Sequence, residues 1–222
     1  MGGREYRLRY IGVNAPESSE GLGREASEAN AGLVEGQTLY LIKDVSDTDQ
    51  YGRLLRYVFT GSLFVNYELA AGGWARQGDY PPDTACSQTL SEAEQTAREA
   101  KLGLWAASAA GPAAAALQIV TVYYDGQAGQ NEPDEYVEIR NGGAQTVNLA
   151  DWYLKDLGRN RFIFPNLEMT PGQTCRVYTN EDHPESCGLS FGKSGSAVWN
   201  NSGDCAALYD PAGYLVDEFC YP

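Results

Sequence analysis

Histidine is almost missing from this chain, which has a single one, His183, in an acidic stretch of the second half. The five cysteines show no CxxC or Cys/His spacing that suggests a zinc site, and the single histidine cannot build one alone. Long apolar runs are missing too. None approaches the roughly 20 residues that a membrane-spanning helix needs, and we therefore predict no membrane span.

Basic residues are scarce. The chain has 16 lysines and arginines against 30 aspartates and glutamates, which gives a formal net charge of -14. Proteins that bind nucleic acid without regard to sequence usually carry a basic surface. Any contact with a polynucleotide must therefore be local, made by a few arginines and a cation. The length of 222 residues accommodates two compact domains of about 100 residues each.

Charged and polar side chains gather where a predicted strand ends. Apolar residues alternate along the strand expected over residues 4–13, and a proline stops it shortly before Glu17. Arg9 and Asn14 belong to the same strand end, and a second arginine, Arg53, lies on the turn into a later strand. Two arginines and a carboxylate that converge are suited to a phosphodiester, because the arginines hold phosphate oxygens and the carboxylate orders water or metal.

Five motifs follow one another in the first half: RYIGVNAPE, GREASEAN, DQYGRLLRYVF, VNYELAAGGWA and AEQTAREAKLGLW. Together, over residues 4–105, they resemble the staphylococcal nuclease-like (thermonuclease) family. The resemblance implies an OB-fold β-barrel with added helices, of the α+β class, over residues 1–105. It also implies calcium-assisted cleavage of DNA or RNA with low sequence preference, leaving a 3′-phosphate.

The resemblance gives catalytic roles to three residues. Glu17 would activate or position the water that attacks phosphorus, and Arg9 and Arg53 would bind the phosphate through their planar guanidinium groups. Calcium takes oxygen ligands, and the family's metal site corresponds here to the Asn14 side chain, the Ala15 carbonyl and Glu17.

Three further residues fall near the substrate in this resemblance. Tyr80 corresponds roughly to the family's nucleotide-contacting tyrosines, and stacking a base on an aromatic ring is worth about 1–3 kcal/mol. A structural tyrosine beside two prolines is an equal alternative for Tyr80. Tyr51 and Asp49 stand close to Arg53 in the sequence and favour its role in phosphate binding.

Two departures from the family pattern weaken the predicted metal site. The family has an aspartate where this chain has the neutral Asn14, so we expect a lower calcium affinity. The family's first strand, with an Asp-Gly-Asp-Thr run, has no counterpart before Gly2-Gly3-Arg4, which is typical of a hairpin exit. We expect a barrel that lacks its first strand and exposes a sheet edge. The alternative function is a catalytically inactive nuclease-like scaffold that acts as a binding protein.

Local patterns predict the other elements of the first half. They are a helix over 23–33, a strand over 38–44, a hairpin of 54–59 with 63–65, a short helix over 67–71, and a helix from Ser91 to Lys101 with Glu94 in a capping box. The alanine-rich residues 106–116 contain a Gly-Pro pair and are predicted to form a semi-flexible linker.

Short strands separated by Gly, Asn, Asp and Pro fill the second half and indicate an all-β sandwich. We expect them over 119–124, 136–140, 147–149, 152–155, 161–164, 175–179, 197–199, 206–209 and 215–221, with Trp152 and Trp199 in the core. The ordered motifs EYVEIRNGG, VNLADWYLKD, FIFPN, LEMTPGQTCRVYTN, VWNNSGDCAALYDPAG and LVDEF resemble the lamin-tail domain, an immunoglobulin-like sandwich. The resemblance assigns residues 117–222 to this domain, whose function would be binding or tethering to a protein or surface ligand.

The cysteines of the second half favour two disulfides. Cys205 and Cys220 flank a predicted hairpin turn, and Cys175 and Cys187 close a short polar loop, which leaves Cys86 unpaired. Disulfides imply an oxidising compartment, so we predict an extracellular or cell-surface location. Five buried reduced thiols are the alternative.

A loop near the start of the second half is strongly acidic. Asp125, Glu132, Asp134 and Glu135 could together hold calcium, but such a group is more typical of a solvated face.

Overall fold

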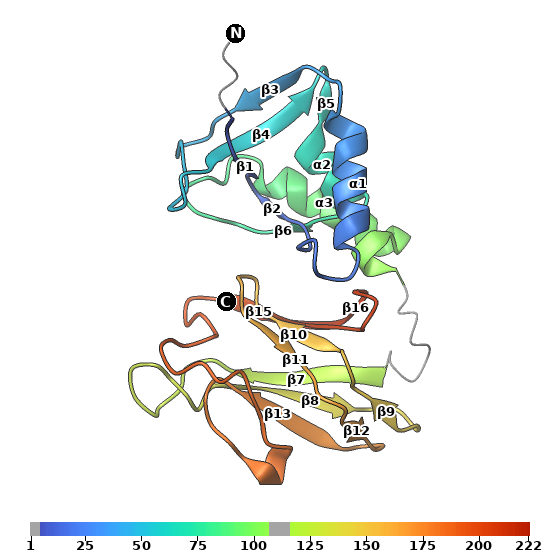
Figure 1. Ribbon diagram of the computed structural model, residues 1–222, viewed down its shortest axis with the longest axis vertical. Coiled ribbons are helices and arrows are strands. Elements are labelled where there is room, and N and C mark those ends of the chain that lie inside the picture. The colour runs from blue at the N-terminus through green and yellow to red at the C-terminus, as the bar shows by residue number, and fades with distance from the viewer. Residues whose placement is uncertain (1–4, 107–115) are drawn as a thin grey trace. The chain divides into compact units, whose positions relative to one another are not determined.

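The computed structural model describes residues 5–106 and 116–222, and the chain divides into two compact units, residues 1–106 and 107–222 (Figure 1). The expected hairpin exit at residues 2–4 and most of the expected linker, residues 107–115, lie outside the described residues. In the part that is described, the helices are too short or too polar to cross a membrane.

Unit 1 combines a small mixed sheet with three α-helices. Its elements are β1 (Leu8–Tyr10), β2 (Val13–Asn14), α1 (Gly23–Val34), β3 (Leu39–Ile42), β4 (Leu54–Thr60), β5 (Leu63–Phe64), α2 (Val65–Ala71), β6 (Arg76–Gln77), α3 (Ser87–Ala100) and the 3₁₀ turn η1 (Gly103–Trp105). The sheet order is β1-β4-β3, with β5 paired to β4, and β2 pairs with β6. Strand β1 runs parallel to β4, whereas β3 runs antiparallel to it.

The strand predicted over residues 4–13 is not continuous. Gly12 has a positive φ of 74° and interrupts it between β1 and β2. A Cβ at this position would lie 2.5 Å from Leu90 Cδ1, so only glycine fits here without a shift of the neighbour. The break lets β2 leave the β1-β4-β3 sheet and pair with β6, which carries Asn14 to the second pair of strands.

The capping box predicted at Ser91 is wrong. Helix α3 begins at Ser87, and its N-cap residue, Cys86, makes no side-chain cap. The Glu94 carboxylate instead accepts hydrogen bonds from the Gln77 backbone N–H and from the Arg98 side chain. These contacts tie α3 to β6, so Glu94 links two elements and does not cap the start of α3.

Asn66 joins three segments in the core of unit 1. It is fully buried in α2, its Oδ1 accepts the Val58 N–H of β4 at 2.9 Å, and its Nδ2 donates to the Ile11 carbonyl at 2.8 Å. Ile11 lies between the two strands that carry Arg9 and Asn14. Asn66 therefore fixes the backbone beneath the candidate site.

Replacing Asn66 by alanine is expected to destabilise unit 1 by about 2–4 kcal/mol, because the buried Val58 N–H and Ile11 carbonyl both lose their partners. Hydrogen exchange of peptides from β4, followed against urea concentration, would measure the loss. Gln95→Ala, at an exposed position of α3, is the control. A change below about 0.5 kcal/mol for Asn66→Ala, the size of an ordinary surface substitution, would contradict the anchoring role.

Strand β3 is an outer strand of its sheet and has little cover. Tyr40 is 56% exposed and Ile42 is 52% exposed, although both are large apolar side chains. An outer strand of this kind leaves backbone N–H and C=O groups available for pairing with another chain.

Unit 2 is a sandwich of two four-stranded sheets. Its elements are β7 (Leu117–Tyr123), β8 (Tyr136–Asn141), β9 (Val147–Asn148), β10 (Tyr153–Lys155), β11 (Arg161–Ile163), β12 (Glu168–Met169), β13 (Thr174–Tyr178), η3 (Pro184–Ser186), β14 (Leu189–Ser190), β15 (Asp204–Tyr209) and β16 (Leu215–Tyr221). The sheet orders are β14-β13-β8-β7 and β11-β10-β15-β16, and β9 pairs with β12 (Figure 1). The core between them contains Trp152 and Trp199, 2% and 1% exposed, as predicted.

The strand pattern predicted for this half differs from the structure at three places. Strands β12 and β14 were not expected. The strand predicted over 197–199 is wrong, because the backbone N–H groups of Val198 and Trp199 donate to the buried Glu135 carboxylate instead of to a neighbouring strand.

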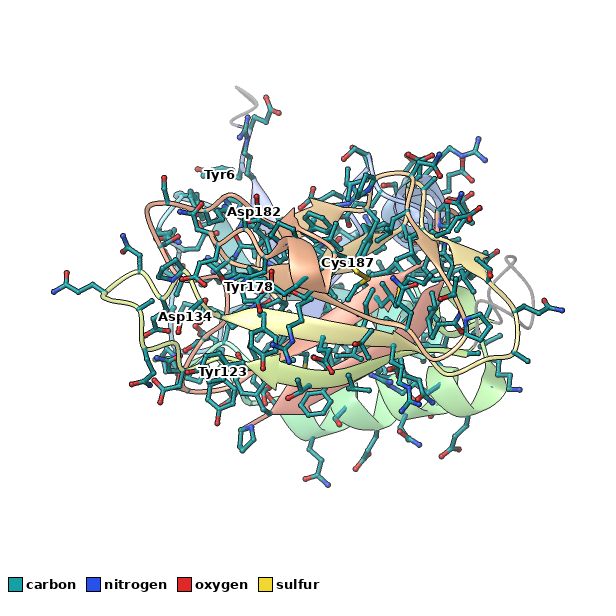
Figure 2. The ribbon with its side chains drawn as sticks, turned by 90° about the horizontal axis from the view of Figure 1, so that it is seen from below. Tyr6, Tyr123, Asp134, Tyr178, Asp182 and Cys187 are labelled. Atoms are coloured by element: carbon teal, nitrogen blue, oxygen red, sulfur yellow. A yellow bond between two sulfur atoms is a disulfide. The ribbon has the colours of Figure 1, made fainter. Side chains whose placement is uncertain are left out.

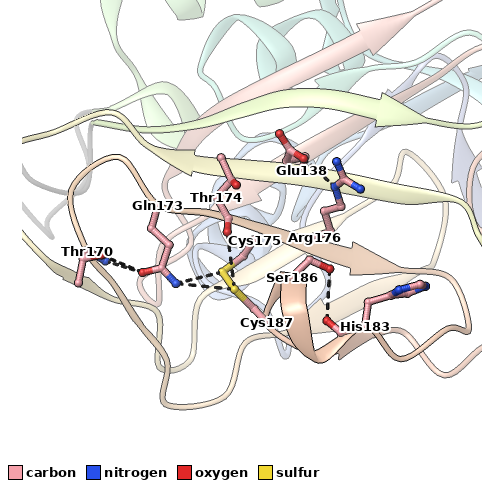
Figure 3. The surroundings of a disulfide bond; sticks show 9 residues. All are labelled: Glu138, Thr170, Gln173, Thr174, Cys175, Arg176, His183, Ser186 and Cys187. Carbon is pink, nitrogen blue, oxygen red and sulfur yellow. Dashed lines mark hydrogen bonds and ion pairs between the residues drawn. A yellow bond between two sulfur atoms is a disulfide. The ribbon is translucent and has the colours of Figure 1, made fainter.

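Both expected disulfides are present, and Cys86 is unpaired. Cys205 and Cys220 lie directly opposite each other in the β15–β16 pair. The Cys175–Cys187 bond ties β13 to the segment around η3, and Gln173 Nε2 contacts both of its sulfurs at 3.8 Å (Figure 3). The disulfides support an oxidising compartment.

Candidate active site

Arg9 contacts two of the predicted site residues. It projects from β1, and its Nη1 donates to the Val13 carbonyl at 2.6 Å while its Nη2 donates to Asn14 Oδ1 at 3.2 Å. The guanidinium of Arg9 also lies over the Tyr80 ring, with Cζ 5.5 Å from the ring centroid. The sequence placed Arg9 and Asn14 together, and the structure adds Tyr80 from a loop 71 positions away.

Arg53 belongs to a second group of contacts, on the turn into β4. Its Nε donates to Asp49 Oδ2 at 2.6 Å, and its Cζ lies 5.5 Å from the Tyr51 ring centroid. Asp49 Oδ1 also accepts the backbone N–H groups of Tyr51 and Arg53. Burial would raise the pKa of Asp49, but the hydrogen bonds from Arg53 and Tyr51 outweigh it and lower the pKa. Asp49 therefore stays ionised and holds Arg53 in one orientation.

The pairing of β1 with β4 relates the two arginines to each other. Arg9 is paired in parallel with Leu55, and Arg53 precedes Leu55 by two residues. Because side chains alternate along a strand and Arg53 directly precedes β4, we expect Arg53, Leu55 and Arg9 to point to one face. Strand spacing and rise place the Cα atoms of the two arginines about 8 Å apart, a distance that two guanidinium side chains can span to one phosphate.

Glu17 lies just beyond β2, with an exposed side chain. Its backbone N–H donates to Glu20 Oε2 at 2.9 Å, and its carbonyl accepts the Glu20 N–H at 2.8 Å. A Cβ at Gly23, where α1 begins, would lie 2.0 Å from the Glu17 carbonyl oxygen, so only glycine allows this approach. The turn is therefore fixed through its backbone, while the Glu17 carboxylate has no hydrogen bond or ion pair within residues 5–106 and is directed to solvent. The neighbouring Ala15 is exposed as well.

Two positioning residues were missed from the sequence. Glu20 holds the turn that carries Glu17, and its spacing of three residues from Glu17 is the only signal in the sequence. Asp83 is 5% exposed, and its Oδ1 accepts the backbone N–H groups of Val45 and Ser46. It fixes the loop of Tyr80, with which it forms an isolated β-bridge. Its partners lie 37 and 38 positions away, so no local pattern indicates them.

The structure thus arranges the predicted residues as two groups of contacts and one exposed carboxylate. Arg9 lies with Asn14 and Tyr80, and Arg53 lies with Asp49 and Tyr51. Guanidinium groups, an exposed carboxylate and nearby tyrosine rings can bind a phosphodiester, accept a proton and stack a base.

Comparison with known proteins matches both units. A family model described as Staphylococcal nuclease homologue matches residues 7–107, and one described as Lamin Tail Domain matches residues 110–222. The thermonuclease of Staphylococcus hyicus is 32% identical over 109 residues, which cover 46% of this chain and 64% of that protein. Endonuclease YncB of Bacillus subtilis (strain 168) is 34% identical over 114 residues, which cover 48% of this chain and 54% of that protein.

A plant relative matches the same half. The probable staphylococcal-like nuclease CAN1 of Oryza sativa subsp. japonica is 34% identical over 108 residues, which cover 47% of this chain and 30% of that protein. This chain therefore spans less than two thirds of the length of these three relatives.

Proposed function

The chain belongs to the staphylococcal nuclease homologue family through residues 7–107 and to the lamin tail domain family through residues 110–222, and on that premise we propose that it hydrolyses phosphodiester bonds of DNA or RNA. Membership also confirms the predicted fold classes, an OB-fold domain followed by an immunoglobulin-like sandwich. The observation that carries the proposal is the hydrogen bond of 3.2 Å from Arg9 to Asn14 Oδ1, because it joins a phosphate-binding group to a metal-binding oxygen.

Arg9 and Arg53 would hold the phosphate. A guanidinium group has five N–H donors. Two nitrogens of Arg9 are engaged with Val13 and Asn14, and Asp49 takes Nε of Arg53, so donors of both side chains remain for phosphate oxygens. These contacts strengthen as negative charge builds on the oxygens in the transition state, and they carry no sequence information. They would therefore give cleavage with low sequence preference.

Glu17 would act as the general base. Its exposed carboxylate would accept a proton from water as the water oxygen bonds to phosphorus, and the bond from phosphorus to the 5′ oxygen would break. The products would be a 3′-phosphate and a 5′-hydroxyl that takes its proton from solvent. Tyr80, beside Arg9, would stack against a base of the bound strand.

The oxygens near Glu17 fit a weakly bound calcium ion. Asn14 Oδ1, the Ala15 carbonyl and the Glu17 carboxylate are the hard donors that calcium prefers, but only one of them is charged, and Asn14 Oδ1 already accepts a hydrogen bond from Arg9. A bound calcium ion would supply positive charge to the phosphate and to the water. Asn14 and Glu17 would hold it at the end of β2.

The lamin tail domain would tether the enzyme to a protein or a surface ligand. With 6 basic against 15 acidic residues after Trp105, it lacks the basic surface of a nucleic-acid-binding domain. Its two disulfides support an extracellular or cell-surface location.

Plasmid cleavage by the full chain, in calcium and in excess EGTA, tests the proposal. We expect calcium-dependent nicking. Asn14→Asp adds a carboxylate to the metal site and is expected to lower the calcium concentration for half-maximal cleavage by about tenfold. The neutral Asn14 favours the second candidate function, an inactive scaffold. Absence of calcium-dependent cleavage by both the natural chain and Asn14→Asp would support that scaffold.

A further inference from the structure

The acidic loop of unit 2 is a solvated face only in part, because Asp125 is exposed whereas Glu135 is buried. Glu135, just before β8, is fully buried. Its Oε2 accepts the Thr179 hydroxyl at 2.9 Å, the Val198 N–H at 3.0 Å and the Trp199 N–H at 3.5 Å. One oxygen of this carboxylate therefore organises the segment that leads to β15.

The other oxygen, Glu135 Oε1, is buried and has no hydrogen-bond donor, and the same holds for Oε2 of Glu132. The two carboxyl groups lie within hydrogen-bonding reach of each other. The second oxygen of Glu132 accepts Asn201 Nδ2 at 3.0 Å, so this side chain is held in place. Two carboxylates within hydrogen-bonding reach of each other cannot both stay ionised unless a positive charge lies between them.

The remaining acids nearby do not have vacant oxygens of this kind. Both oxygens of Asp134, which Figure 2 shows near Tyr123, accept backbone N–H groups, from Gln127 at 2.8 Å and Ala128 at 3.0 Å. Asp204 Oδ1 accepts the N–H groups of Leu157 and Cys205. Among these four acids, the buried oxygens without a donor therefore belong to Glu132 and Glu135.

The Tyr221 hydroxyl is a second, independent sign of a ligand. Tyr221 is 8% exposed, its hydroxyl is buried without a hydrogen-bond partner, and it pairs with Asp204 across β15 and β16. Burial raises the pKa of Tyr221, and the negative charges of Asp204 and Glu135 raise it further, so the hydroxyl lies within electrostatic range of both carboxylates. A buried hydroxyl without a partner, within electrostatic range of a carboxylate whose second oxygen has no donor, indicates that another species completes the group.

We propose that Glu132 and Glu135 bind a divalent cation of the calcium class in the lamin tail domain, separate from the candidate active site. Two carboxylates would neutralise the double charge of the ion. Calcium takes six to eight oxygens in irregular geometry, so water and backbone carbonyls can supply the others. The ion would connect the loop before β8 to the segment of residues 198–201, which Glu135 already contacts at Val198 and Trp199 and Glu132 at Asn201.

Calorimetric titration of the full chain with calcium chloride tests this site. The starting protein carries Glu17→Gln, which weakens the candidate site in unit 1. We expect about one calcium ion per chain in this background, and an increase in the unfolding temperature of unit 2 on calcium addition. Adding Glu132→Gln should lower the remaining affinity at least tenfold and abolish the increase.

The control is Glu168→Gln, at an exposed position of β12, which should leave both values unchanged. Glu135→Gln is a less suitable variant, because Glu135 also holds the fold together. If the Glu17→Gln chain binds no calcium, or binds it equally well after Glu132→Gln, the carboxyl pair shares a proton and the proposal is overturned. Nuclease activity plays no part in these measurements, so they remain decisive even if the proposed hydrolysis fails.

Discussion

Glu17→Gln is expected to lower the rate constant of calcium-dependent DNA cleavage by about 10²–10⁴-fold, the usual contribution of a general base. The amide has the size and shape of the carboxylate but cannot accept the proton of the attacking water. The turn should keep its structure, because Glu17 contacts Glu20 only through its own backbone N–H and carbonyl. The loss should therefore fall on kcat, with a smaller change in KM. Steady-state cleavage of a fluorescent single-stranded oligonucleotide measures both.

Glu28→Gln is the matched control for this substitution. Glu28 is an exposed residue of α1 whose ion pair with Arg24, at 3.8 Å, lies on the surface and contributes little. The cleavage rate of the Glu28→Gln variant should stay within about twofold of that of the natural chain, the range of an ordinary surface substitution. If Glu17→Gln behaves like Glu28→Gln, the proton is taken by another group and the proposed mechanism is wrong.

Elements that local patterns specify were predictable from the sequence. The hairpin of β4 and β5 follows from alternating apolar residues around Gly61, whose φ is 58°, and α1 is followed by Gly36, as predicted. The β15–β16 disulfide follows from a turn midway between Cys205 and Cys220. In each case the residues that decide the structure lie within about 20 positions of one another.

Long-range contacts explain the failures. Glu94 has the spacing of a capping residue, but its partner Gln77 belongs to another element. Val198 and Trp199 have the composition of a strand, but their N–H groups are taken by Glu135, more than 60 positions earlier. The sequence offers no local sign of such a competitor, so a buried carboxylate can remove a strand that propensity favours.

In the candidate site, too, contacts between residues close in the sequence were predictable, whereas long-range contacts were not. The contacts of Arg9 with Asn14 and of Arg53 with Asp49 join residues five and four positions apart, and both were expected to be close. The position of Tyr80 over Arg9 depends on the loop that Asp83 fixes, and only the family resemblance suggested it. The expected convergence of Arg9 and Arg53 on one face depends on the parallel pairing of β1 with β4, which pairs residues about 46 positions apart.

The expected position of Arg53 on the same face as Arg9 leads to the second large effect, a loss of cleavage on its substitution. Arg53→Lys is expected to lower kcat/KM by about 10²–10³-fold, the cost of removing one preorganised donor from a developing oxyanion. Lysine keeps the positive charge but lacks the planar fork that binds two oxygens, and it cannot keep the Nε contact with Asp49 while also reaching phosphate. Arg24→Lys, at a side chain 78% exposed on α1, is the control and should leave kcat/KM within about twofold.

The combination of Arg53→Lys with Arg9→Lys tests whether both side chains act on one phosphate. Residues that act on separate groups give losses that multiply, whereas residues that share one partner in the transition state give a combined loss that departs from the product. Because Arg9 and Arg53 share a face of the β1–β4 pair, with Cα atoms about 8 Å apart, we expect the double variant to lose at least tenfold less than the product. Losses that multiply would show that the two arginines bind different parts of the substrate, and the mechanism would then retain only one phosphate-binding guanidinium beside Glu17.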